Sequence, residues 1–360
     1  MIILNSILSN FLIMQKCHSF LLLMLLIVLV SACKKHSDDL GSEVSTIAGS
    51  GYKGSLNGIG KSTSFNKPTG ITSDNQGNFY VADAGNNLIR KITYAGIVTT
   101  LSGIADSAGY RDGPVSQALF NNPTGVATDE AGNVYVADNG NHVIRKITKA
   151  TGMVSTIAGS AGKAGYADGT GTSALFNSPF GIAIDSADNL YVADTDNNFI
   201  RKITRNGNVT TLTFIDKSDG NNNLIFKHPR GIALDKSGRI CIADTDNSFI
   251  YICSSGNTLI NILGETAGIG PPFSKPYGVA ADNSGNVYIA DTYDNNIHEI
   301  TLAVLISLVA GRSLNPGHTD AKGTSASFYL PAGITYCSVD GNIYVADTGN
   351  NLIRKITLSE

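Results

Sequence analysis

Short apolar runs alternate with turns rich in glycine, asparagine and aspartate along most of the chain. The segment PFGIAIDSADNLYVADTDNNFIRKITRNGNVTTL, residues 179–212, contains four such runs: GIAID, LYVAD, FIRKI and VTTL. β-branched residues dominate the runs, and the density of glycine and asparagine leaves no stretch with a 3.6-residue period. The pattern therefore predicts four short antiparallel strands joined by tight turns.

This four-strand unit is repeated along the chain. YVADAGNNLIRKIT at residues 80–93 returns almost unchanged as YVADTGNNLIRKIT at 344–357, and looser copies begin at residues 135, 191, 241 and 288. Each copy follows a Pro-x-Gly, and a phenylalanine stands three residues before each proline, which predicts a repeated core position. These phenylalanines are Phe65, Phe120, Phe176, Phe226, Phe273 and Phe328. Six four-stranded sheets around an axis form a β-propeller.

The repeat is out of phase with the ends of the chain. Six segments resemble a fourth strand, but the first, residues 44–49, precedes the first Pro-x-Gly, and the last copy has no fourth strand of its own. We therefore predict that residues 44–49 complete the sheet that contains 344–356, which would leave the ring without a free edge. The predicted fold class is all-β: a six-bladed β-propeller over residues 44–360, with four antiparallel strands per blade and the N-terminal strand completing the last blade.

On these motifs the chain resembles the NHL repeat family of six-bladed propellers. The matching features are PxGIAxD, the Gly-Asn turn, YVAD, the asparagine pair and IRKI. The resemblance implies the fold more than a function, because family members include peptide-amidating lyases, RNA-binding modules and extracellular sensor domains. The lyases hold a metal with several histidines near the pore mouth. The histidines of this chain share no offset within the repeat, so that activity is not carried over.

The first 43 residues predict export and a lipid anchor. An apolar tract, Phe20 to Val30, is too short to span a bilayer and fits a secretory signal that ends at residue 32, with Met14 as an alternative start. The LVSAC sequence resembles the lipobox of bacterial lipoproteins, which implies lipidation of Cys33. Residues 33–43 predict a flexible tether. Lys34 favours the outer membrane of a bacterial cell envelope, on its periplasmic or surface face.

Charge argues against a nucleic-acid partner. The mature chain keeps all 29 acidic residues and all but one of the 26 lysines and arginines, a net charge of about −4, whereas nucleic-acid binding needs a basic face. Four repeats carry an Arg-Lys pair, which we expect to be solvated or paired with aspartate. The pairs are Arg90/Lys91, Arg145/Lys146, Arg201/Lys202 and Arg354/Lys355.

Two sets of repeated aspartates are predicted to accept hydrogen bonds from turn amides rather than to ring a metal. The first set ends the second strand of each unit: Asp83, Asp138, Asp194, Asp244, Asp291 and Asp347. The second set opens the preceding turn: Asp74, Asp129, Asp185, Asp235 and Asp282. Cys241 and Cys253 fall on two strands of one predicted hairpin, so a disulfide between them is a further possibility in an oxidising compartment.

The candidate binding site lies where the repeats differ. The residue inside each Pro-x-Gly leads into the innermost strand, so these six residues are expected to surround the axis: Thr69, Thr124, Phe180, Arg230, Tyr277 and Ala332. With the residues before the prolines, repeats three to five contribute Phe180, His228, Arg230, Lys275 and Tyr277. Two aromatic rings and up to three positive charges suit an anionic or sugar-like ligand, although unconstrained variation at exposed positions would give the same letters.

These observations favour a binding or scaffolding module. Its partner is an unidentified glycan, peptide or envelope protein, and we expect a monomer that meets the membrane only through its lipid. No cofactor or metal is expected, and no catalytic residue is identified, since HExxH, GxSxG and phosphate-binding glycine motifs are absent from the sequence. The alternative is an enzyme of the lyase or lactonase type that acts on a small substrate in the central channel.

Overall fold

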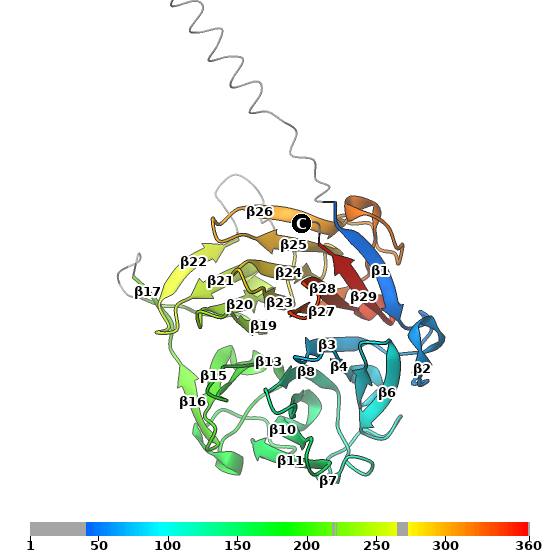
Figure 1. Ribbon diagram of the computed structural model, residues 1–360. Helices are drawn as coiled ribbons and strands as arrows, with labels where there is room; N and C mark the ends of the chain where they lie inside the picture. The colour runs from blue at the N-terminus through cyan, green and yellow to red at the C-terminus, as the bar shows by residue number, and fades with distance from the viewer. Residues whose placement is uncertain (1–40, 218–219, 221, 265–272, 359–360) are drawn as a thin grey trace, which may run out of the picture. The chain divides into compact units, whose positions relative to one another are not determined.

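The computed structural model describes residues 41–217, 220, 222–264 and 273–358. All of them belong to one compact unit, Asp39–Glu360, whose main sheets form the blades of a ring (Figure 1). The predicted signal, Cys33 and most of the predicted tether lie outside the described residues. Within the described part of the chain, no helix combines the length and the apolar character needed to cross a membrane.

Each blade is built from consecutive antiparallel strands, as the alternation of apolar runs and turns predicts. Blade one contains β3 (Pro68–Ser73), β4 (Phe79–Asp83), β5 (Leu88–Ile92) and β6 (Ile97–Ser102); blade two contains β8 (Pro123–Thr128), β9 (Val134–Asp138), β10 (Val143–Thr148) and β11 (Met153–Ala158). Blade three contains β13 (Pro179–Ile184), β14 (Leu190–Asp194), β15 (Phe199–Ile203) and β16 (Asn208–Leu212); blade four contains β19 (Pro229–Leu234), β20 (Ile240–Asp244), β21 (Phe249–Cys253) and β22 (Leu259–Leu263). Blade five contains β23 (Gly278–Ala281), β24 (Val287–Asp291), β25 (Asn296–Ile300) and β26 (Ile306–Gly311); blade six contains β27 (Pro331–Cys337), β28 (Asn342–Asp347), β29 (Leu352–Thr357) and β1 (Glu43–Ala48).

The connections add short elements that the sequence pattern did not predict. Two-residue strands pair with the outermost strands of blades one to three and cover their edges: β2 (Gly58–Ile59), β7 (Gly113–Pro114) and β12 (Gly169–Thr170). A small separate hairpin consists of β17 (Ile215–Asp216) and β18 (Asn222–Asn223). Single 3₁₀ turns are η1 (Gly60–Ser62), η2 (Ala84–Asn86), η3 (Asn139–Asn141), η4 (Gly171–Ser173), η5 (Thr195–Asn197), η6 (Thr245–Asn247), η7 (Gly323–Ser325) and η8 (Thr348–Asn350).

The N-terminal strand closes the ring. β1 pairs antiparallel with β29, with Glu43 opposite Thr357 and Val44 opposite Ile356. In Figure 1 the blue β1 lies beside the red β29. Val44 and Ala48 are buried in the clusters on the two sides of blade six, so the strand also supplies core side chains. The predicted completion of the last blade by residues 44–49 is confirmed.

The core lies between neighbouring blades. The second strand of every blade is buried along its whole length, because both faces pack against an adjacent sheet. The six repeated phenylalanines are all buried, which confirms them as core positions. In four blades a buried arginine of the third strand stacks on this phenylalanine, with its guanidinium carbon 5.0–5.1 Å from the ring centroid.

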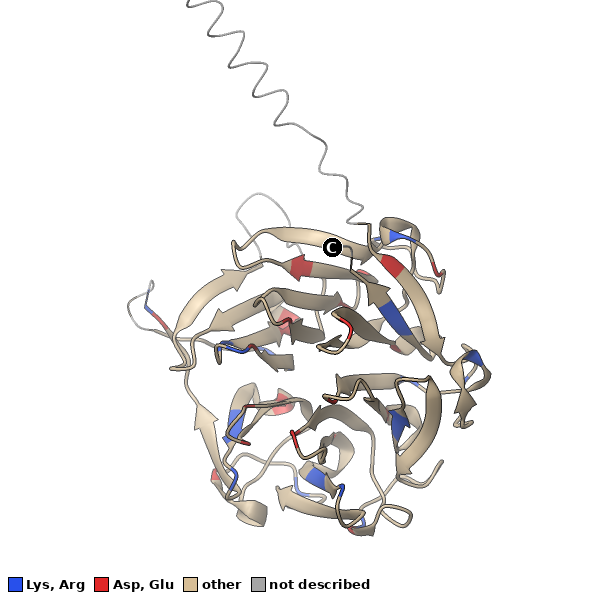
Figure 2. Cartoon of the chain, in the orientation of Figure 1, with Lys and Arg blue, Asp and Glu red and all other residues tan. Residues whose placement is uncertain are grey.

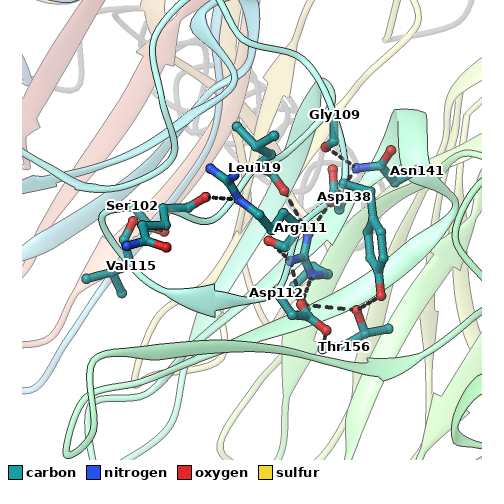
Figure 3. Close-up of polar contacts among 12 residues, drawn as sticks. Ser102, Gly109, Arg111, Asp112, Val115, Leu119, Asp138, Asn141 and Thr156 are labelled. Atoms are coloured by element: carbon teal, nitrogen blue, oxygen red, sulfur yellow. Dashed lines mark hydrogen bonds and ion pairs between the residues drawn. The ribbon is translucent and has the colours of Figure 1, made fainter.

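The repeated aspartate that ends the second strand is structural, as predicted, but its partners differ from those expected. In blade two, Asp138 accepts hydrogen bonds from the amide of Asn121 at 2.8 Å and from Arg145 Nη1 at 2.8 Å. It also accepts one from Asn141 Nδ2 at 2.8 Å (Figure 3). The Asp138 and Arg145 side chains are both 0% exposed. Arginines at this position are therefore buried and paired with aspartate, and the solvated alternative is wrong. The second set behaves as predicted: Asp74 Oδ1 accepts the amides of Gln76 and Asn78.

The possible disulfide between Cys241 and Cys253 does not form. Cys241 pairs with Ile252, and Cys253 pairs with Ile240, so the two side chains lie on opposite faces of the sheet. Cys241 packs in the core between blades four and five, whereas Cys253 packs in the core between blades three and four. Both are buried free thiols.

Candidate functional site

The six residues inside the Pro-x-Gly segments meet around the axis. All of them line one cavity of about 290 Å³: Thr69, Thr124, Phe180, Arg230, Tyr277 and Ala332. The walls are the six innermost strands, β3, β8, β13, β19, β23 and β27, which lie in the middle of the ring in Figure 1. The sequence therefore placed these positions correctly.

The glycine of each Pro-x-Gly sets the spacing of the innermost strands. A Cβ atom on Gly181 would lie 2.1 Å from the carbonyl oxygen of Arg230, and one on Gly231 would lie 2.3 Å from that of Tyr277. Only a residue without a side chain permits this approach. The close contact brings the residues that precede these glycines near one another on adjacent blades.

Arg230 is held between two aromatic rings at this cavity. Its guanidinium carbon lies 4.2 Å from the ring centroid of Tyr277 and 4.8 Å from that of Phe180, within range of a cation–π interaction. The two rings meet edge to face, with centroids 5.9 Å apart. Burial raises the pKa of Tyr277, so its phenol stays neutral beside the guanidinium. Three of the five predicted residues therefore form one cluster, which we call the Arg230 sandwich.

No described residue neutralises the charge of Arg230. Its Nε is buried without a hydrogen-bond partner, and no side chain of the described segments forms an ion pair with the guanidinium. By contrast, Arg90, Arg145, Arg201 and Arg354 each pair with a buried aspartate. A rigid and unpaired guanidinium in a cavity is prepared to bind an anion.

His228 and Lys275 lie apart from the cavity walls. His228 Nδ1 is 2.7 Å from Asp246 Oδ2, and Lys275 Nζ is 3.3 Å from Asp246 Oδ1. Although burial opposes ionisation, the hydrogen bonds from these two side chains hold the pKa of Asp246 below its ordinary value. Lys275 also lies over the ring of Tyr293, which in turn contacts Tyr277. Of the up to three positive charges predicted, two therefore belong to side chains that contact Asp246, and only Arg230 lacks an ion pair with a described residue.

The sequence pattern did not indicate Asp246 and Tyr293. Both stand in the turn after the second strand, where the copies differ in sequence, so repeat position alone did not point to them.

The residues before the prolines vary in side chain because their contact with the neighbouring blade is made by the backbone. His228 and Lys275 have φ values of 47° and 50°, in the left-handed region, and the other four copies are similar. Their amides donate to a side chain of the preceding blade: His228 to Asn198 Oδ1 at 2.7 Å and Lys275 to Ser248 Oγ at 3.3 Å. Because the main chain makes the contact between blades, the side chain is free to vary, and His228 and Lys275 remain 41% and 49% exposed.

The two ends of the innermost strands differ in charge. At the end opposite the Arg230 sandwich, a second hollow of about 320 Å³ is lined by Asp74, Asp129, Glu130, Asp235 and Asp282, among others. It shares Ser73, Thr128, Leu234, Ala281 and Tyr336 with the walls of the first cavity. Elsewhere, lysine and arginine are interspersed with aspartate and glutamate around the ring (Figure 2). An anion is therefore favoured only at the Arg230 end.

A closed six-bladed propeller with an axial cavity is a class that includes both binding proteins and enzymes. Five segments of this chain match the NHL repeat model: residues 65–92, 120–147, 176–203, 226–252 and 328–356. The chain is therefore an NHL-repeat propeller, as its motifs predicted. The strands of blade five lie outside the matched segments.

The curated relatives resemble this chain over only part of their sequences. The chain is 36% identical over 169 residues to protein SUPPRESSOR OF QUENCHING 1, chloroplastic, of Arabidopsis thaliana, covering 44% of this chain and 16% of that protein. It is 42% identical over 96 residues to NHL repeat-containing protein 2 of Gallus gallus, covering 26% and 12%. The match thus spans about a sixth or less of these relatives' length.

Solved propellers share the fold at low sequence identity. An auxiliary nutrient binding protein from Bacteroides thetaiotaomicron superposes with a TM-score of 0.66 at 16% identity, covering 89% of this chain and 77% of that one. Virginiamycin B lyase from Staphylococcus aureus gives 0.54 at 17%, with 88% and 99% covered. A gluconolactonase from Xanthomonas campestris gives 0.57 at 12%, with 82% and 87% covered.

Proposed function

We propose that this protein is a binding module whose axial cavity takes a small anionic, sugar-like ligand at the Arg230 sandwich. The observation that carries the proposal is the guanidinium of Arg230, which is stacked between Phe180 and Tyr277 and forms no ion pair with a described residue. A planar fork held in this way binds a carboxylate or phosphate with two parallel hydrogen bonds. His228 and Lys275, on the same blades as Arg230 and Tyr277, add rim contacts.

The remainder of the cavity suits the body of such a ligand. Its volume of about 290 Å³ is close to the lower end of small-molecule sites. Threonine hydroxyls such as Thr69 and Thr124 line it together with apolar side chains, which is the mixture that a sugar ring contacts. Nutrient-binding propellers of the same fold from Bacteroides agree with a binding role.

The enzyme alternative finds less support in the same cavity. Among the described residues that line it, none is a histidine, aspartate, glutamate or cysteine. General acid–base catalysis most often uses one of these groups, and burial raises the pKa of each tyrosine that lines the cavity, Tyr277 and Tyr336. Lyase and lactonase propellers share the fold, but at 12–17% identity the likeness does not extend to chemistry.

Replacing Arg230 tests the proposal. Glucuronate and glucose 6-phosphate, with uncharged glucose for comparison, are titrated calorimetrically into the wild type and Arg230→Ala. We expect the charged sugars to bind more tightly than glucose, and Arg230→Ala to lose about 1–3 kcal/mol of that binding, since hydrogen bonds to charged groups contribute this much. Tyr277→Ala should weaken binding by a similar amount through loss of a central anchor.

Arg205→Ala is the matched control, because Arg205 is 79% exposed and pairs loosely with Asp188. It should bind like the wild type. Equal affinity for glucose and the charged sugars, or wild-type affinity in Arg230→Ala, would remove the anion site. A large fall in the melting temperature without loss of binding would make Arg230 a structural residue.

We further propose that the protein is held in the bacterial cell envelope, at the outer membrane, by lipid on Cys33. The support is the apolar tract and LVSAC sequence of residues 20–33. Cys33→Ser should release the protein from the membrane fraction and change its electrophoretic mobility, because several acyl chains are needed for stable anchoring. Cys241→Ser, which alters a buried thiol of blade four, is the control and should stay with the membrane. Membrane association of Cys33→Ser with unchanged mobility would contradict the anchor.

A further inference from the structure

Blade five departs from the other blades at three neighbouring positions. The turn and third strand carry Asp294, Asn296 and His298, where the other copies have Asn, an apolar residue and, in four of the five, Arg. Together with the repeated Asp291, these residues form what we call the blade-five cluster. Each replacement introduces a side chain with an oxygen or nitrogen atom that can coordinate a metal, and all three occur in the same blade.

The equivalent positions in the other blades show what the replacements remove. In blades one, two, three and six, the arginine lies 2.7–2.9 Å from the buried aspartate and cancels its charge. In every blade but the fifth, the asparagine three residues after that aspartate donates Nδ2 to its Oδ2. These asparagines are Asn86, Asn141, Asn197, Asn247 and Asn350. Blade four also lacks the arginine, having Tyr251, but it keeps the asparagine.

Blade five therefore holds the two carboxylates of Asp291 and Asp294 without the guanidinium that blades one, two, three and six place beside the buried aspartate. Asp291 is 0% exposed and accepts only the amide of Ser274, at 2.8 and 2.9 Å, apart from a distant His298 Nε2 at 3.9 Å. Burial, helped by the charge of Asp294, raises the pKa of Asp291 to about 7. A buried carboxylate beside a second carboxylate, without a cation, is unfavourable unless something neutralises it.

The potential ligand atoms converge. One atom each from Asp291, Asp294 and His298 lies within 4.8 Å of the others. The His298 side chain is only 13% exposed, and both of its ring nitrogens are buried without a hydrogen-bond partner. Asn296 is 2% exposed, and its Oδ1 is also buried and unpartnered. Asn296 faces Asp291 across the strand pair, so its side chain lies on the same face as those of Asp291 and His298.

The surroundings orient these groups. Ser313 Oγ donates to Asp294 Oδ1 at 2.5 Å, and Asn296 Nδ2 donates to Asp294 Oδ2 at 3.0 Å. The imidazole of His298 stands edge to face with Phe273, at the place where arginine stacks on phenylalanine in other blades.

We propose that the blade-five cluster binds a divalent transition-metal ion of the Zn²⁺ class, with Asp291, Asp294 and His298 as ligands and Asn296 Oδ1 as a further oxygen donor. Imidazole with carboxylates is a donor set for zinc and its neighbours rather than for Ca²⁺. Zinc ligands lie about 2.0–2.2 Å from the ion. The potential ligand atoms, now up to 4.8 Å apart, must therefore draw closer together when the ion binds.

The ion takes the place of the guanidinium that blades one, two, three and six use. None of the four residues lines the axial cavity, so the site is separate from the Arg230 sandwich. It is a structural site that ties the third strand of blade five to its second. It departs from the expectation, drawn from the sequence, that no metal is bound.

The test uses the full-length purified protein, stripped with a chelator and then titrated with Zn²⁺ or Co²⁺. We expect one ion per chain, a visible Co²⁺ absorption band of low-symmetry coordination, and a rise in melting temperature on adding metal. His298→Arg and Asp294→Asn restore residues that other blades carry, so both should fold. Each should weaken metal affinity by at least about 10–100-fold, the loss seen even for groups outside the ligand set.

His298→Arg distinguishes lost binding from lost folding. Without metal, its melting temperature should equal or exceed that of the stripped wild type, and Zn²⁺ should no longer raise it. His318→Ala, which removes an exposed histidine, is the control and should bind metal like the wild type. The proposal fails if the wild type binds no stoichiometric ion, if His298→Arg binds as tightly, or if His318→Ala loses binding equally.

Discussion

Deletion of Glu43–Gly49 is expected to unfold the last blade before the others. The deletion removes β1 and leaves β29 as an open edge, and it uncovers the clusters that hold Val44 and Ala48. Burial of one valine contributes about 1.5–3 kcal/mol, and each 1.4 kcal/mol corresponds to a tenfold change in an equilibrium. Amide exchange in β27–β29, followed by mass spectrometry, should therefore accelerate by at least about tenfold relative to blades two and three.

Two further variants make this experiment decisive. Deletion of residues 34–40 has the same length, spares β1 and should leave exchange in β27–β29 unchanged. Restoring the strand at the other end should rescue protection: because Glu43 faces Thr357, an Asn-Gly pair in place of the last two residues, followed by a second copy of Ser42–Gly49, forms a short hairpin with β29. Unchanged exchange after deletion of Glu43–Gly49 would contradict closure by this strand.

Arg145→Met is expected to cost about 3–5 kcal/mol of unfolding free energy, because it leaves Asp138 buried without its counter-ion. The guanidinium is fully buried, donates to the carbonyls of Leu119 and Arg111, and pairs with both Asp138 and Asp112. These four partners are labelled in Figure 3. Its ring contacts with Tyr110 and Phe120 would also be lost. Urea denaturation of the purified variant measures the change in midpoint and slope.

The neighbouring Lys146→Met is the control, since Lys146 is half-buried and lies over Tyr135 without an ion pair to a described residue. It should change stability by no more than about 0.5 kcal/mol. The double variant Arg145→Met/Asp138→Asn should be less unstable than the sum of the two single changes, because it removes the stranded charge. A cost below about 1 kcal/mol for Arg145→Met would mean that the buried pair contributes little.

The candidate site was only partly accessible from sequence. The ring of residues inside Pro-x-Gly followed from repeat position, and it brought Phe180, Arg230 and Tyr277 together as predicted. Repeat position did not show that the charges of His228 and Lys275 face a carboxylate. Asp246 comes from a different turn and meets both side chains only in the folded protein. The blade-five cluster has the same origin: its letters were visible, but their meaning depends on which atoms the turn and third strand place together.

What the sequence determined by itself was the architecture. Apolar alternation and turn residues specify the strands, and the spacing of the copies gives the blade number, because each unit buries its faces only against a neighbouring copy. The phase of the repeat specifies closure by β1. Tertiary structure decided the state of each polar group. Whether an arginine is solvated or buried, or a carboxylate is paired or stranded, depends on burial and on partners that are distant along the chain. The repeated aspartate that ends the second strand pairs with Arg145 in blade two, as Asp138, and lies beside His298 and Asp294 in blade five, as Asp291.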